Sequence, residues 1–168
     1  DAGVEGHYIR TVPSDGLTRD RAQFETLQIK NLAHDPDLPA ADQVSTDFLQ
    51  LVRYGLRGAD DAAVLDTLKV IDRLLETRTP AGPVWHRYND DGYGEHADGA
   101  AFDGAGCGRG WPLLTGERGH YALVAGEDVT PYLEAMASMG NPLGLIPEQV
   151  WDTAPIPGGG LRPGRPSC

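Results

Sequence analysis

Apolar residues recur at helical spacing in several stretches of the chain. The clearest stretch follows Asp60-Asp61 and continues until Thr79-Pro80. Its apolar positions are Val64, Leu65, Leu68, Ile71, Leu74 and Leu75. Residues three or four apart lie on one face of an α-helix. The stretch therefore predicts an amphipathic helix that one of the two aspartates caps.

The preceding stretch predicts a second helix, from about Asp42 to Gly55 or Gly58. Its apolar face is formed by Val44, Phe48, Leu51 and Val52. Strand signals are sparse: residues 6–12 resemble a short strand before a turn signal at 13–16.

Two more helices are predicted downstream. One runs from Pro112 to Ala125, with proline in its first turn and Gly126 after its end. The other begins at Thr130-Pro131 and ends near Gly140-Asn141-Pro142. Four helices and few strands predict an all-α fold.

The sequence also predicts two loops, one between the second and third helices of the chain and one after the fourth. Residues 80–110 are rich in glycine, aspartate and aromatic side chains, and residues 140–152 follow the last predicted helix. Loops as long as the first are usually functional or disordered, and its aromatic residues argue against disorder. The tail, 153–168, is rich in proline and glycine and is expected to be irregular.

Composition narrows the functional classes. The 168 residues suffice for one domain with a core. A formal net charge of −11 argues against general nucleic-acid binding, which needs clustered cations. No apolar run is long enough to predict a membrane span. Because the chain begins at Asp1 without methionine, we expect a processed or truncated start.

The cysteines and histidines match no common motif. Cys107 and Cys168 can pair only if the fold brings them together, and neither lies in a Cys-x-x-Cys pattern. The chain has no His-Glu-x-x-His zinc motif and no Gly-x-Ser-x-Gly elbow. The glycine-rich run 104–110 fits neither dinucleotide nor P-loop patterns, so its glycines are expected to let the backbone approach a ligand or another loop.

The segment Ile146-Pro-Glu-Gln-Val-Trp-Asp152 is the first candidate for chemistry. It places the carboxylate of Glu148 after a stiffening proline and beside the amide of Gln149 and an indole. Carboxylate, amide and aromatic face suit a neutral sugar ring. The residues alone equally allow a solvated surface glutamate near a turn.

The segment 85–95 is the second candidate. It interleaves Arg87, Asp90, Asp91 and Glu95 with aromatic residues that include Tyr93. This mixture can hydrogen-bond sugar hydroxyls and stack on a ring. Two alternatives stay open: a polar loop with a structural salt bridge, and a calcium site. The calcium ligands would include Asp98 and Asp103, but the spacing does not match an EF-hand loop.

The segment 111–121 is the third candidate. Its adjacent charges, Glu117 and Arg118, point in different directions on a helix and are not expected to pair. One of them is expected to face a buried polar network, and the alternative is a surface charge.

Together these segments resemble glycoside hydrolase family 15, the glucoamylase and glucodextranase family, in its prokaryotic branch. The resemblance rests on the strings at 87–95, 111–121 and 146–152, in that order, and extends to the run 65–72. It implies an (α/α)6 barrel with the active site in loops at one end, and hydrolysis of α-glucosidic bonds from non-reducing ends with inversion.

The resemblance also implies roles for residues. Glu148 matches the general base, which activates a water opposite the leaving group, roughly 6.5–9.5 Å from the general acid. Arg87, Asp90 and Asp91 match sugar-binding positions, and Trp111 matches an aromatic residue at the rim of the site. Tyr93, Glu95 and Gln149 are further substrate-binding candidates. Glu117 and Arg118 are candidates for supporting the residues that contact the sugar.

The chain also departs from the family pattern. Nothing in residues 1–80 resembles the surroundings of the general acid, and only about four of twelve barrel helices are predicted. We therefore expect residues 1–168 to be the C-terminal portion of a catalytic domain, a partial barrel that is inactive alone. Such a piece would expose apolar helix faces to a partner, the missing half of the barrel.

The expected substrate is an α-glucan or maltooligosaccharide, with no cofactor and calcium as a minor possibility. Within this class, α-1,4 linkages are favoured over α-1,6 linkages or trehalose. The competing hypothesis is a carbohydrate-binding or partner-docking module without hydrolysis.

Overall fold

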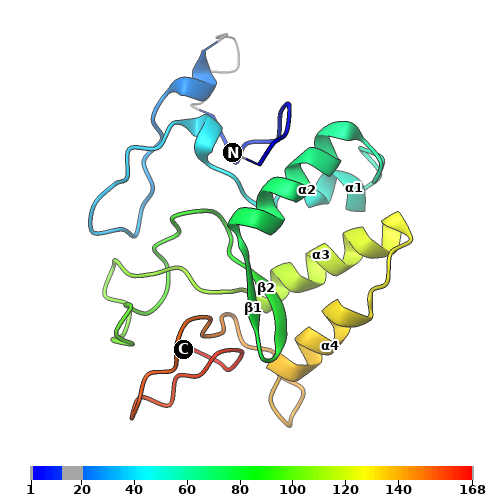
Figure 1. The fold of residues 1–168 in the computed structure, drawn as a ribbon. Coiled ribbons are helices and arrows are strands. Elements are labelled where there is room, and N and C mark those ends of the chain that lie inside the picture. The colour runs from blue at the N-terminus through cyan, green and yellow to red at the C-terminus, as the bar shows by residue number, and fades with distance from the viewer. Residues whose placement is uncertain (1, 13–20, 168) are drawn as a thin grey trace.

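Four α-helices and one β-hairpin form most of the regular structure of residues 2–12 and 21–167, the part that the computed structural model describes. Short 3-10 turns lie at Ala22–Phe24 and Ala40–Asp42. The other elements are α1 (Leu49–Arg53), α2 (Ala62–Leu74), β1 (Glu76–Thr79), β2 (Gly82–Trp85), α3 (Pro112–Ala125) and α4 (Thr130–Met139). Figure 1 shows the helices on one side, irregular loops on the other and the hairpin between them.

Helix α2 confirms the strongest periodicity in the sequence. The carboxylate of Asp61 caps it by accepting hydrogen bonds from the backbone N–H groups of Ala63 and Val64. Its apolar face packs against α1, Trp85 and α3. The buried residues of this core are Val44, Phe48, Leu49, Val52, Val64, Leu68, Val70, Ile71, Leu75, Trp85, Leu114 and Tyr121.

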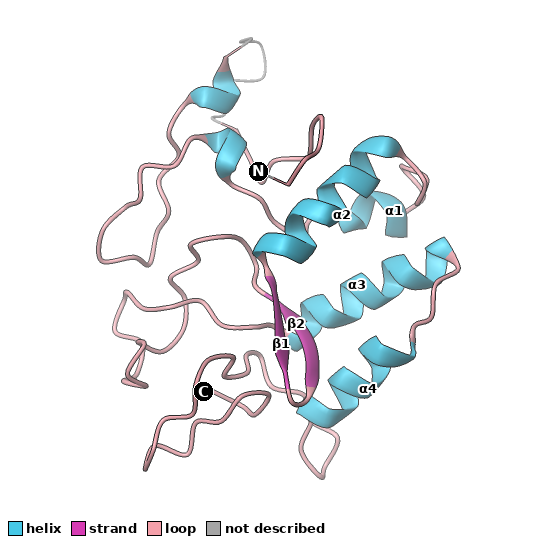
Figure 2. Ribbon diagram, in the orientation of Figure 1, coloured by secondary structure: helices cyan, strands magenta, loops and turns pink. Residues whose placement is uncertain are grey.

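The hairpin after α2 was not predicted. Helical periodicity continues to Leu75, but α2 ends at Leu74, and β1 pairs antiparallel with β2 through Glu76 opposite Trp85 and Thr79 opposite Gly82. Gly82 has φ of 123°, and a side chain there would collide with Ala135 of α4. The hairpin therefore packs closely against α4, so the all-α prediction is right only in that most regular structure is helical (Figure 2).

Helices α3 and α4 have the predicted bounds. Pro112 occupies the first turn of α3, and Gly126 ends it in the left-handed conformation at φ of 74°. The two helices pack against each other and against β2. A second small core of Val84, Ala135, Met139 and Val150 joins this pair to the loop after α4.

Two predictions upstream were wrong. The helix predicted from about Asp42 spans only Leu49–Arg53, and Val44 precedes it, because the N–H of Val44 donates to the side chain of Asn89 in the long loop. Residues 6–12 form no strand, although the N–H of Arg10 donates to the carbonyl of Gln43. The predicted turn at 13–16 lies outside the described residues.

An apolar groove of about 500 Å³ lies along α3 and α4. Leu113, Leu123 and Leu133 line it and are each more than 60% exposed. None of the described helices is long and apolar enough to cross a membrane.

Candidate functional site

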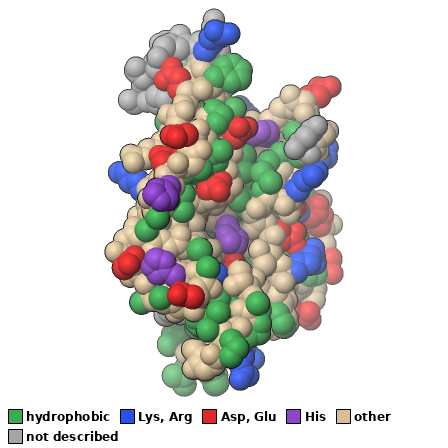
Figure 3. All heavy atoms as spheres, turned by 60° about the vertical axis from the view of Figure 1, so that its left-hand side comes forward, with side chains coloured by type: hydrophobic (Ala, Val, Ile, Leu, Met, Phe, Trp, Pro, Cys, Tyr) green, Lys and Arg blue, Asp and Glu red, His purple; other side chains and the backbone are tan. Residues whose placement is uncertain are grey.

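The two candidate loops lie side by side. Trp111 pairs with Trp85 at the end of β2, and the N–H of Val150 donates to the carbonyl of Gly110 at 2.9 Å. Val150 also bridges to Pro166 in the tail. These bridges bring the long loop, the Glu148 segment and the tail together on the loop side of Figure 1, where hydrophobic side chains are interspersed with carboxylates and histidines (Figure 3).

An ion pair between the half-buried Arg87 and the buried Asp91 orders the start of the long loop. Nε and Nη2 of Arg87 donate to the two carboxylate oxygens of Asp91 at 2.7 and 2.8 Å. The same carboxylate accepts from the backbone N–H of Tyr93 at 3.0 Å. The hydrogen bonds to Asp91 raise the pKa of Arg87 further above its ordinary value. Nη1 of Arg87 makes no hydrogen bond to any described residue, so it is free to donate to a ligand.

Aromatic rings flank this guanidinium. Its centre lies 5.0 Å from the ring of Tyr93 and 4.9 Å from that of Trp111. The two rings are 6.2 Å apart and tilted by 35°. The structure therefore brings three predicted residues together as a fixed cation beside two ring faces, a combination that can donate to hydroxyls and stack on an apolar ring face.

Glu148 is an exposed carboxylate on an anchored segment. The next three residues, Gln149, Val150 and Trp151, are completely buried. Nε2 of Gln149 donates to the carbonyl of Tyr93 at 3.1 Å, which joins this segment to the aromatic cluster. The side chain of Glu148 makes no hydrogen bond or ion pair with any described residue. It therefore combines a firmly held backbone with a carboxylate that is open to solvent.

Arg109 connects the two loops and was missed by the sequence analysis. Its side chain is 2% exposed, and Nη2 donates to the carbonyls of Glu95 and His96 at 2.8 and 2.9 Å. The guanidinium stacks 3.8 Å from the ring of Trp151 and lies 3.5 Å from the carboxylate of Asp152. Asp152 also pairs with His86 at 2.6 Å. The only sequence signal was a lone arginine in a glycine-rich run.

The glycines around Arg109 allow loops to approach one another. Gly108 donates its N–H to the carbonyl of Asp91, and Gly106 donates to that of Asn31. A side chain on Gly94, where φ is 156°, would collide with the carbonyl of Cys107. These contacts agree with the prediction that the run 104–110 permits close backbone approach.

Two other predicted site residues, Asp90 and Arg118, do not take part in the ion pair of Arg87 with Asp91. Asp90 is exposed with φ of 59° and accepts from the side chain of Asn89, so it does not share the buried position of Asp91. Arg118 pairs with Asp72 of α2 at 3.2 Å, in a network that also holds the indole of Trp85.

Glu117 faces the opposite way from Arg118, as predicted. Burial, and then the nearby charge of Asp47, raises its pKa. Neither residue forms a hydrogen bond or ion pair with the aromatic cluster in the described part of the chain.

No group of three or more His, Cys, Asp or Glu residues within 2–12 and 21–167 is arranged to hold a metal ion. The carboxylates considered for calcium are dispersed, and Asp103 pairs with His96 at 3.2 Å. Cys107 is a free, partly buried thiol, and the possible Cys107–Cys168 pair involves a residue outside the described part.

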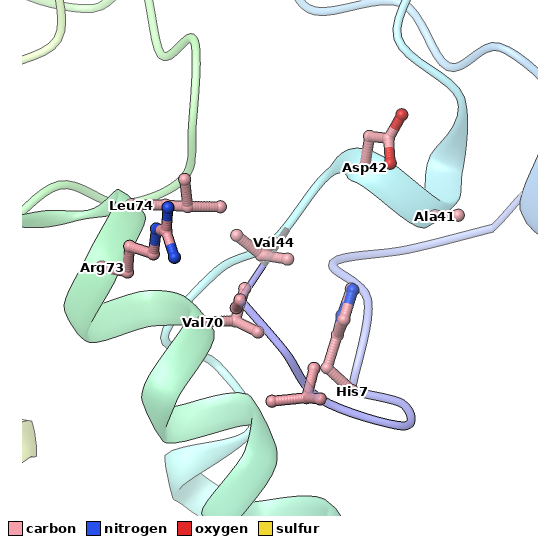
Figure 4. Close-up of a pocket in the computed structure, with 9 residues that line it drawn as sticks. His7, Ala41, Asp42, Val44, Val70, Arg73 and Leu74 are labelled. Carbon is pink, nitrogen blue, oxygen red and sulfur yellow. The ribbon is translucent and has the colours of Figure 1, made fainter.

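A separate cavity of about 320 Å³ lies between the N-terminal segment and α2. Figure 4 shows His7, Asp42 and Arg73 around it, on different segments. None of the predicted site residues lines it. The predicted site therefore lies in the long loop and the Glu148 segment, and not in this cavity.

Comparison with known proteins finds glucoamylases among the relatives of this chain. The chain is 46% identical over 151 residues to a glucoamylase of Clostridium sp. (strain G0005), a match that covers 90% of this chain and 21% of that protein. Its structure matches that of a bacterial glucoamylase complexed with acarbose with a TM-score of 0.81 and 42% identity, covering 95% of this chain and 22% of the other. No family model matches.

A glycosidase structure at 22% identity and a TM-score of 0.52 is similar in fold. The chain thus spans about a fifth of the length of the glucoamylases it matches. The resemblance to glucoamylases of glycoside hydrolase family 15, predicted from three strings, is confirmed over nearly the whole chain.

Proposed function

We propose that this chain carries the general-base part of a glucoamylase active site. In this proposal, residues 1–168 are the C-terminal portion of an (α/α)6-barrel catalytic domain, with 153–168 as its irregular tail. The supporting observation is the cluster of Arg87, Tyr93 and Trp111, to which Gln149 ties the anchored segment of Glu148, in a chain 46% identical to a glucoamylase. The substrate would be an α-glucan or maltooligosaccharide, and the neighbour's complex with acarbose supports an oligosaccharide.

Glu148 is assigned as the general base. Its carboxylate takes a proton from a water that attacks the anomeric carbon opposite the leaving group, so the product is released with inverted configuration. An exposed carboxylate on a buried, fixed backbone suits this role, because it is open to water and yet held in place. The general acid, which protonates the leaving oxygen, would come from residues beyond these 168.

The cluster at the start of the long loop is assigned to sugar binding. Nη1 of Arg87 donates to a sugar hydroxyl while the buried carboxylate of Asp91 fixes the guanidinium. The rings of Tyr93 and Trp111 form the walls. Asp90, which is exposed, is assigned as a hydroxyl acceptor at the edge of the site.

The remaining predicted residues support these groups. Gln149 ties the Glu148 segment to the carbonyl of Tyr93, and the carboxylate of Glu95, in the same loop as Tyr93, lies 3.9 Å from the guanidinium of Arg109. Arg118 joins α3 to α2 through Asp72, which fixes the helix that begins beside Trp111. Glu117 would act more remotely, through the packing of α3 against α1.

The test is Glu148→Gln in the longer natural protein that contains this chain. The amide cannot take a proton, so glucose release from maltooligosaccharides should fall by about 10²–10⁴-fold, with KM changed far less. Glu134→Gln, on the exposed face of α4, is the matched control and should retain the normal rate. A near-normal rate for Glu148→Gln would overturn the base assignment.

A second candidate function is a carbohydrate-binding or partner-docking module without hydrolysis. The exposed apolar groove along α3 and α4 favours the docking form of this candidate, because such a face suits a protein partner. Incubating the 168-residue chain with maltooligosaccharides, isomaltooligosaccharides and trehalose distinguishes the candidates. Binding without glucose release, in the chain and in the longer protein alike, would favour the module, while the preferred sugar would identify the linkage.

A further inference from the structure

The position of the Glu148 carboxylate is set by the backbone that carries it. Glu148 is exposed, and its side chain makes no hydrogen bond or ion pair with any described residue. Two neutral hydrogen bonds hold the next two residues, to the carbonyls of Tyr93 and Gly110. The three residues that follow, 151–153, are held by a different and charged group.

This group is the guanidinium of Arg109, which contacts all three residues. It stacks 3.8 Å from the ring of Trp151, and its Nη1 lies 3.5 Å from the carboxylate of Asp152 and 3.4 Å from the hydroxyl of Thr153. Trp151 is completely buried, and the side chain of Asp152 is 2% exposed. These contacts therefore fix the chain within five residues of Glu148.

The same guanidinium is anchored in the long loop. Its Nη2 donates to the carbonyls of Glu95 and His96 at 2.8 and 2.9 Å, and its Nε lies 3.9 Å from the carboxylate of Glu95. Both residues follow Arg87 and Tyr93 in that loop. Arg109 therefore joins the segment that carries the proposed base to the loop that carries the proposed sugar-binding groups.

We infer that Arg109 is a positioning residue for the Glu148 carboxylate. The inference rests on the proposed function, because the position of Glu148 affects the rate only if Glu148 is the base. The side chain of Arg109 is 2% exposed, so it acts through the segment 151–153 and does not touch the sugar. Displacing a reacting group by about 1 Å can lower a rate by about 10²-fold. A base without side-chain contacts of its own is sensitive to such a displacement.

The shape of the guanidinium allows these contacts to form together. Its planar fork donates from Nη1 and Nη2 to different acceptors while its face stacks on the indole of Trp151. A lysine ammonium is a compact charge on a flexible stem and cannot reproduce this arrangement. Arg109→Lys therefore keeps the charge beside Asp152 and loses the geometry, so a lower rate in that variant reports position and not charge.

The experiment is a double-mutant cycle in the longer natural protein, with glucose release from maltooligosaccharides as the measured rate. Arg109→Lys should lower kcat by about 10–100-fold, with KM changed by less than about threefold. In the Glu148→Gln background the same substitution should lower kcat by less than about threefold, because the amide no longer takes a proton whatever its position. Arg162→Lys, at an exposed arginine of the tail, is the matched control and should keep the normal rate.

A second variant tests the same contact from its other side. Asp152→Asn removes the charge that Arg109 contacts and should lower kcat by about tenfold only where Glu148 is present. It decides the question if Arg109→Lys does not fold, as far-UV circular dichroism at the assay temperature would show.

Two outcomes overturn the inference: an unchanged kcat in the folded variant, or an equal loss with and without Glu148. The second outcome would mean that Arg109 supports the loops in general and not the position of the base. A near-normal rate of Glu148→Gln by itself would instead refute the proposed function. The single variants therefore distinguish failure of the inference from failure of the proposed function.

Discussion

The two side chains of the Arg87–Asp91 ion pair differ in their exposure to solvent, so we expect their removal to destabilise the fold by different amounts. The carboxylate side chain of Asp91 is 0% exposed, whereas the guanidinium side chain of Arg87 is 33% exposed. Removing the arginine therefore leaves a buried charge, and removing the aspartate charge leaves a cation that water reaches. We predict that Arg87→Met destabilises the fold more than Asp91→Asn.

The magnitudes follow from what remains after each change. In Arg87→Met, the carboxylate of Asp91 loses its cation and keeps only neutral donors, the N–H of Tyr93 at 3.0 Å and the hydroxyl of Tyr88, and losing one partner of a buried pair costs about 3–5 kcal/mol. In Asp91→Asn, the guanidinium is still hydrated and still lies near the rings of Tyr93 and Trp111. The loss of its charged acceptor should cost about 1–3 kcal/mol.

Urea unfolding of the chain at pH 7, followed by tryptophan fluorescence, measures both values. Arg78→Met is the control, because its side chain is 80% exposed and its 2.7 Å pair with Glu76 lies at the surface. That variant should lose less than about 1 kcal/mol. A loss for Arg87→Met as small as that of the control, or a larger loss for Asp91→Asn, would refute the reasoning.

Three further predictions test other parts of the account. Arg109→Met should cost about 3–5 kcal/mol in urea unfolding, because it leaves buried carboxylates without their cation, and Arg109→Lys should restore only part, since an ammonium cannot stack on Trp151 as a planar guanidinium does. Glu117 has a raised pKa in the folded chain, so its charge opposes folding above that pKa and has no effect below the unfolded value of about 4.3. Unfolding measured against pH should show Glu117→Gln more stable than the wild type at pH 7 and equal to it below pH about 4; a gain at low pH only would contradict this sign. Asp61→Ala should lower the free energy of unfolding by about 0.5–2 kcal/mol through loss of the α2 cap, and an unchanged midpoint would show that the cap is dispensable.

Local sequence signals were sufficient to predict those helices whose first or last turn contains a capping residue. Asp61 begins α2 and Gly126 ends α3 by contacts within a few residues of themselves, so sequence spacing predicted both. The hairpin depends on a different kind of contact. Gly82 allows β2 to meet α4, about fifty residues later, and no local pattern encodes that approach.

The residues of the candidate site also divide into those that the sequence identified and those that only the fold identifies. The strings around Arg87 and Glu148 were recognisable, and the structure places their loops together through the bridge between Gly110 and Val150. Arg109 was not recognisable, because its partners include backbone carbonyls fourteen and thirteen residues away and the ring of Trp151. Backbone carbonyls leave no trace in residue identity, so only the fold identifies this arginine.

The most direct test of the central claim is the reaction of Glu148→Ala, in the longer natural protein, with α-glucosyl fluoride in the presence of azide. Without the base, water is not activated, and azide, which needs no deprotonation, attacks in its place from the same face. We predict that azide restores turnover and that the product is β-glucosyl azide, identified by NMR. Failure of azide to restore turnover, or formation of the α-anomer, would contradict the assignment of Glu148 as the general base of an inverting enzyme.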